Sequence, residues 1–172
     1  MPNTKPVGVA FSDPELTSGT TITGAVIDST SKILSNIANG STASQQGATI
    51  ATTGNSDVFI IAPAAGTLTS AVFSGVDALT TSDTNYITFS ITNLGLTGSG
   101  SAVMLAATDA NTTKATGGTA LTANAARTLT LNGTAANLVV AAGDRLRIRA
   151  AATGTLANTV TFPVYRVNFT VV

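Results

Sequence analysis

Strict alternation of apolar and polar residues constrains the fold of this chain more than any other feature. In residues 85–93, NYITFSITN, the side chains of Ile87, Phe89 and Ile91 fall on one face, with Tyr, Thr and Ser between them. Successive side chains of a β-strand point to opposite faces, so this period of two predicts a strand with one buried face. Residues 144–152, DRLRIRAAA, alternate in the same way.

Short apolar segments follow one another from residue 57, separated by turns of Gly, Asn, Asp and Pro. We expect strands over 57–63, 67–76, 85–93, 101–108, 127–133, 137–140, 144–152 and 160–172. No convincing helix lies between these segments, so the sequence predicts an antiparallel all-β sandwich or barrel of about eight strands. The apolar residues expected in its core are Phe59, Ile61, Phe73, Ile87, Phe89, Leu131, Ile148, Phe162 and Phe169.

The last of these segments changes the parity of its apolar positions. Val160 and Phe162 lie on one face, whereas Tyr165 and Val167 lie on the other. One extra residue in a strand exchanges its two faces, and proline is tolerated at such bulges. We therefore expect a bulge or bend at Pro163.

The N-terminal part of the chain, residues 1–49, is interpreted as an arm and linker, and residues 50–172 as the sandwich. Three of the five prolines fall in residues 1–24, which predicts an extended, irregular backbone there. Apolar residues between the prolines favour an arm that orders on a partner. Residues 25–40 fit a short helix or a strand, and the pattern leaves both open.

Composition excludes several classes of function. The chain has no His and no Cys, so Ser-His-Asp and Cys-His catalysis, disulfides, and thiolate or imidazole metal sites are impossible. The carboxylates lie singly beside turn residues, where Asp commonly caps the backbone, and TSDTN (81–85) and TDANTT (108–113) offer too few ligands for calcium. We expect no enzyme activity and no cofactor.

Charge and hydropathy bear on the partners of the chain. Only 9% of the residues are charged and the net charge is zero, which does little to prevent self-association. Eight basic residues with two Tyr and no Trp make nucleic acid an unexpected partner. The apolar runs are shorter than the ~18 residues that a membrane helix needs, and no export signal is visible, so we expect synthesis in the cytoplasm.

Arg145, Arg147 and Arg149 are the one ordered charge feature. Their spacing of two places all three on one face of a strand, with Leu146 and Ile148 on the other. Two interpretations stay open: a solvated outer face, or a ladder that pairs with acids on a neighbouring strand, subunit or partner.

Three turn motifs carry a resemblance. They are APAAGT at Ala62–Thr67, TSDTNY at Thr81–Tyr86, and LVVAAGD at Leu138–Asp144. Over about residues 57–165 the chain resembles a family of tailed-phage virion proteins that decorate the capsid. The resemblance implies a jelly-roll-like β-sandwich, commonly a homotrimer, on the outer surface of the virion. It also implies the major capsid protein of a phage head as the partner, and no enzyme activity.

Two surfaces are therefore candidates for the capsid contact. One is the N-terminal arm, through Phe11, Asp13, Pro14, Glu15 and Leu16; the other is the charged strand of Arg145, Arg147 and Arg149. The alternative function is a tail-associated or receptor- or glycan-binding virion module. Such a module should expose aromatic rings for stacking on sugars, and only Tyr86 and Tyr165 are candidates besides the phenylalanines.

Overall fold

The computed structural model describes residues 41–171. The predictions for residues 1–40 lie outside the described residues; they include the arm, the helix or strand over 25–40, and the contact residues Phe11, Asp13, Pro14, Glu15 and Leu16. Within the described range, no helix is long and apolar enough to cross a membrane.

The described part of the chain is built from β-strands, as the alternation predicted. The strands are β1 (Ser41–Gln46), β2 (Asn55–Ile61), β3 (Gly66–Ser74), β4 (Tyr86–Asn93), β5 (Ala102–Val103), β6 (Arg127–Leu129), β7 (Val139–Val140), β8 (Arg145–Thr153) and β9 (Val164–Val171). The helical elements in this range are two 3-10 turns, η1 (Asp109–Asn111) and η2 (Ala135–Leu138). The all-β prediction is confirmed.

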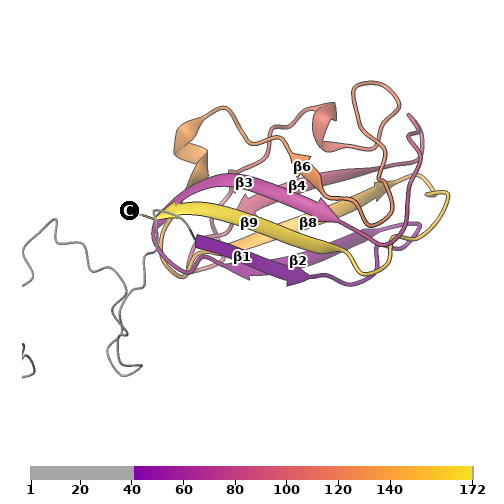
Figure 1. Ribbon diagram of the computed structural model, residues 1–172. Coiled ribbons are helices and arrows are strands. Elements are labelled where there is room, and N and C mark those ends of the chain that lie inside the picture. The colour runs from indigo at the N-terminus through magenta and orange to yellow at the C-terminus, as the bar shows by residue number, and fades with distance from the viewer. Residues whose placement is uncertain (1–40, 172) are drawn as a thin grey trace, which may run out of the picture. The chain divides into compact units, whose positions relative to one another are not determined.

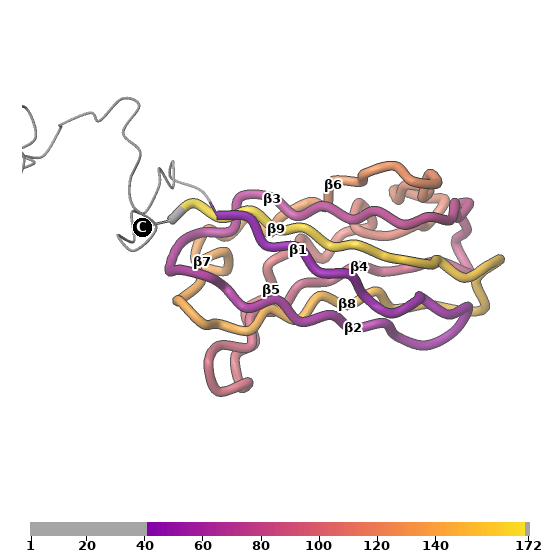
Figure 2. Tube along the Cα trace, turned by 60° about the horizontal axis from the view of Figure 1, so that its bottom comes forward, coloured from indigo at the N-terminus to yellow at the C-terminus, as the bar shows by residue number. Residues whose placement is uncertain are grey.

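These strands form two antiparallel sheets that face each other (Figure 1). The first sheet has the order β1-β9-β3-β6, with β7 also paired to β3, and the second has the order β2-β8-β4-β5. The chain passes from one sheet to the other after β1, β2, β3, β5, β7 and β8 (Figure 2). Two sheets connected in this way are a jelly roll, which confirms the expected sandwich.

The core lies between the inner faces of the two sheets. Along β4 the buried side chains are Ile87, Phe89 and Ile91, so the predicted face is confirmed. The ring of Phe73 on β3 lies 4.7 Å from the ring of Phe89, centroid to centroid, and 5.3 Å from that of Tyr165 on β9. Aromatic residues of both sheets therefore meet in the middle of the sandwich.

Strand β2 corrects part of the predicted core. Phe59 and Ile61, which we expected to be buried, are 53% and 54% exposed, and Val58 and Ile60 are buried instead. The run VFII has no alternation, so the sequence alone cannot assign its two faces. Pairing with β8 determines which face of β2 is buried, because Phe59 lies opposite Arg147 and Val58 opposite Ile148.

The chain bends ahead of β9, close to the predicted bulge at Pro163. Val160 forms a single bridge with Ile50, and the strand resumes at Val164. Between them Phe162 has a φ of +47°, so its side chain leaves the core and is 63% exposed. The prediction that Phe162 is a core residue was wrong, because the change of backbone direction falls on it.

Other strands differ from their expected limits. β1 lies upstream of residue 50, where we expected the sandwich to begin, and pairs with β9 along its whole length. Its polar residues at a sheet edge carry no alternation that a sequence pattern could detect. Residues 137–140, expected as a strand, divide between η2 and β7. Leu131 lies beyond β6, forms a single bridge with Leu105, and is only partly buried against the core.

Candidate functional site

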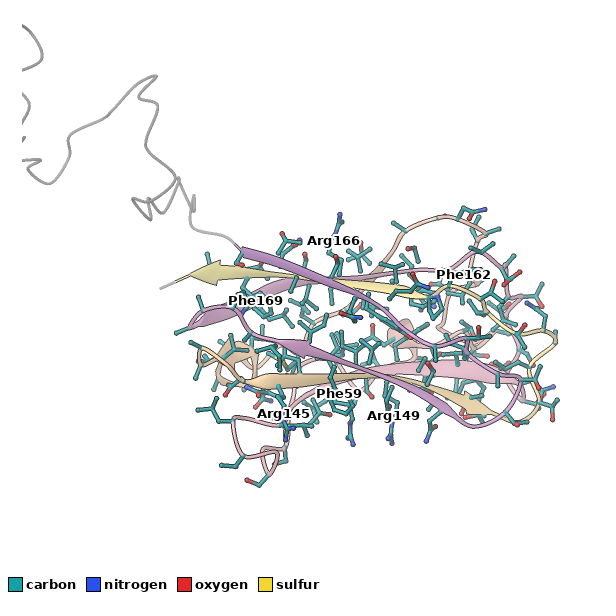
Figure 3. All side chains as sticks on the ribbon, turned by 90° about the horizontal axis from the view of Figure 1, so that it is seen from below. Phe59, Arg145, Arg149, Phe162, Arg166 and Phe169 are labelled. Carbon is teal, nitrogen blue, oxygen red and sulfur yellow. The ribbon has the colours of Figure 1, made fainter. Side chains whose placement is uncertain are left out.

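The outward face of the second sheet carries the ordered charges of the chain. Arg145, Arg147 and Arg149 project from β8 on this side, and Leu146 and Ile148 are buried on the other, as their spacing predicted. Figure 3 shows Arg145 and Arg149 on the same side of the sandwich as Phe59. We call this surface the cationic face; it comprises Asp57, Phe59, Ile61, Ser90, Thr92, Val103, Arg145, Arg147 and Arg149.

Arg149 is neutralised within the chain. Its Nε donates to Asp57 Oδ1 at 2.7 Å and its Nη2 donates to Asp57 Oδ2 at 2.6 Å, across the β2–β8 pair. This two-pronged geometry suits a guanidinium and a carboxylate. The hydrogen bonds from Arg149 hold the pKa of Asp57 below its usual value, although partial burial opposes the shift. The proposed pairing with a neighbouring strand therefore applies to one of the three arginines.

Arg147 and Arg145 have no carboxylate partner among the described residues. Arg147 lies between Phe59 on β2 and Thr92 on β4, and its Nε is buried without a hydrogen-bond partner in that range. Arg145 is exposed, and a side chain at Gly98 would collide with its guanidinium. Arg145 therefore lies against the loop between β4 and β5.

Exposed apolar side chains accompany these two arginines. Phe59 and Ile61 flank them on β2, and Val103 on β5, 42% exposed, lies opposite Thr92. Leu96, 66% exposed, belongs to the β4–β5 loop, which projects from the second sheet in Figure 2. Clustered exposed apolar side chains, unlike scattered ones, mark interaction sites.

A groove continues the cationic face beyond β4. It has a volume of about 280 Å³ and lies between the outward side of β4 and the segment 105–114, with Val103 common to both surfaces. Lys114 donates to Asp109 at 2.8 Å across its rim, and the Lys114 ammonium lies 5.0 Å from the centre of the Tyr86 ring. Tyr86 is partly exposed here, whereas Tyr165 is buried in the core and is unavailable to any ligand.

Arg127 on β6 fixes the chain segment behind this groove. Its Nη1 donates to the carbonyl of Thr119 at 2.9 Å, and its Nη2 donates to the carbonyls of Ala110 at 2.9 Å and Thr112 at 2.7 Å. Partial burial lowers the pKa of Arg127. These bonds give Arg127 a structural role that the sequence analysis did not single out.

The outward face of the first sheet has a different character. Thr42 on β1 donates to the Asn168 side chain at 2.8 Å, and Asn168 donates to the Ser70 hydroxyl on β3 at 2.7 Å. Arg166 projects from β9 on this side, opposite to Arg145 and Arg149 in Figure 3. On this face, hydrogen bonds between side chains connect Thr42, Asn168 and Ser70 across three neighbouring strands.

The described residues contain no group of three or more His, Cys, Asp or Glu side chains that could hold a metal ion. Every carboxylate in this range accepts hydrogen bonds from within the fold: Asp57 from Arg149, Asp77 from Thr161, Asp83 from Thr116, Asp109 from Lys114 and Asp144 from Asn93 and the Ala141 amide. The carboxylates serve turns and ion pairs, as the sequence predicted for most of them.

Comparison with known proteins adds no identification: no family model matches the chain, no curated protein matches it, and no solved structure matches it. The fold and the cationic face are therefore argued from the residues of this chain alone.

Proposed function

We propose that this protein is a structural component of a phage virion that decorates and stabilises the outer surface of the capsid. The observation that supports the proposal is a jelly roll whose outward face carries exposed apolar side chains and two arginines, Arg145 and Arg147, that have no carboxylate partner among the described residues. Jelly rolls recur in viral capsid and lectin domains, and the fold supports the proposal in this way. The capsid as the partner is proposed because the turn motifs resemble those of the phage decoration proteins.

Decoration would stabilise a shell through binding alone. A protein that binds only the assembled shell favours that shell over its free parts by mass action. Several linked copies convert modest single contacts into firm attachment. No reaction has to be catalysed, and the carboxylates of the described residues are occupied in structural bonds.

The direct test is electron microscopy of phage heads. Heads made with this gene should carry regularly spaced projections, and heads made without it should be smooth and should disrupt more readily on heating. Projections that persist on heads made without the gene would refute the proposal.

We further propose that the protein is a homotrimer, as the resemblance implies. A surface with few charges and many hydroxyls offers little electrostatic resistance to self-association. Light scattering at micromolar concentration measures the mass directly. A mass near the 17.0 kDa of one chain would contradict the trimer.

The N-terminal residues Phe11, Asp13, Pro14, Glu15 and Leu16 remain our proposed anchor on the capsid. The three prolines of residues 1–24 would restrict the unbound backbone and so lower the entropy lost on docking. Deleting residues 2–20 should abolish co-sedimentation with bare heads if this anchor dominates. If the truncated protein still binds the heads at full occupancy, the main capsid contact lies on the sandwich and not on these residues.

The groove beside Tyr86 is the observation that favours the second candidate, a glycan-binding virion module. Its aromatic ring and polar rim are compatible with a sugar, although Lys114 already lies over that ring. Glycan-array binding that is lost in Tyr86→Ala, together with normal heads in the absence of the protein, would favour this candidate over decoration.

A further inference from the structure

We infer that the cationic face docks onto an acidic strand or ridge of the capsid protein, through Arg145 and Arg147 with Phe59 and Ile61 beside them. The inference rests on the proposed function, because it names the surface that makes the capsid contact and the chemistry of the surface that receives it. It assigns the described domain a contact of its own, in addition to the N-terminal anchor.

Charge complementarity identifies the partner as acidic. All five carboxylates of the described residues are engaged, and Arg149 already has one of them. No two of these carboxylates lie two residues apart on one strand, so a second copy of the described domain offers no matching pair of acids to Arg145 and Arg147. Arg145 and Arg147 have no carboxylate partner among the described residues, so an acidic partner would supply the missing counter-charges.

Geometry defines the arrangement of the acids. Arg145 and Arg147 lie two residues apart on one face of β8, so their Cα atoms are separated by about 7 Å. Two carboxylates on alternate residues of an extended strand have the same separation. An acidic segment parallel or antiparallel to β8 would therefore meet both guanidinium groups at once.

The apolar side chains explain how the contact excludes water. Phe59 lies opposite Arg147 and Ile61 opposite Arg145, so each arginine has an exposed apolar neighbour on β2. Burying these side chains against the partner would lower the local dielectric and strengthen the charge pairs. The partner surface should accordingly carry apolar residues beside its acids.

A protein partner fits this surface better than nucleic acid does. Phosphate recognition requires many cations along a backbone, and only Arg145 and Arg147 lack a carboxylate on this face of the described domain. Exposed aliphatic side chains such as Ile61 offer nothing to a sugar-phosphate chain.

The test is a co-sedimentation titration of the full-length protein on bare heads, at about 0.1 M and 1 M salt. Arg145→Gln combined with Arg147→Gln should weaken binding about tenfold or more at low salt. The matched control is Arg166→Gln, which removes an exposed arginine from the opposite face and should leave binding unchanged. Wild-type binding should weaken at 1 M salt, where the Debye length falls from ~10 Å to ~3 Å.

Phe59→Glu is a second variant that separates a loss of binding from a loss of folding. The new carboxylate faces Arg147 across the strand pair, so it should supply an internal partner, leave the melting temperature unchanged or higher, and still weaken binding to heads. Unweakened binding by both this variant and the double variant would overturn the inference while the proposed function survives. Displacement of the protein by duplex DNA would also overturn it. Wild-type protein that fails to bind heads would refute the function itself.

Discussion

Phe89→Ala tests whether the core assignment is right. The Phe89 side chain is 2% exposed, its ring lies 4.7 Å from that of Phe73, and the guanidinium carbon of Arg127 lies 5.4 Å from its centre. Removing a buried phenyl ring loses its transfer free energy and leaves a cavity, which together cost about 3–5 kcal/mol. About 1 kcal/mol of this cost comes from the lost aromatic contact with Phe73.

Thermal unfolding followed by circular dichroism measures this cost. For a domain of this size, a loss of 3–5 kcal/mol should lower Tm by about 10–20 °C. All variants are compared at one protein concentration, because oligomerisation makes Tm concentration-dependent.

Phe59→Ala is the matched control, since it makes the same change on β2 at a side chain that is 53% exposed. An exposed substitution of this kind should cost about 0.5 kcal/mol. If Phe59→Ala destabilises as much as Phe89→Ala, or if Phe89→Ala melts within a degree of wild type, the inward and outward faces of the second sheet are misassigned.

Three further substitutions have definite expected outcomes. Tyr165→Phe should leave the free energy of unfolding unchanged or raise it in urea titrations, because the buried hydroxyl has no hydrogen-bond partner among the described residues. A large decrease in that free energy would show that the hydroxyl does form a hydrogen bond in the folded protein. Phe162→Gly should raise Tm, because glycine adopts the φ of +47° without strain and the lost phenyl ring is 63% exposed; a lower Tm would show that the ring is buried in an oligomer. Asp57 has a pKa lowered by Arg149, so it stabilises the fold above about pH 4, and that stability is lost as the pH falls through the lowered folded value. Asp57→Asn should therefore flatten the dependence of unfolding free energy on pH between 7 and 3, and an unchanged slope would contradict the ion pair.

Alternation in the sequence determined the parts of the fold in which apolar and polar residues exchange at every step. In residues 87–91 and 145–149 only one face of the strand is apolar, so only that face can be buried. The structure buries that face. The resemblance and the turn motifs led to the expected jelly roll, which the strand order bears out. The alignment of the three arginines on one outward face followed from the same periodicity.

Tertiary structure alone decided the places where the pattern is silent. The run of four apolar residues in β2 presents either face equally well, and only the register against β8 sends Phe59 and Ile61 outward to the arginines. Arg149 pairs with Asp57, 92 residues away in the chain, whereas Arg147 has no carboxylate partner within residues 41–171; strand pairing decides this difference. The cationic face is therefore a product of pairing between distant strands, because a sequence pattern reports which residues share a face but not which strand lies beside it.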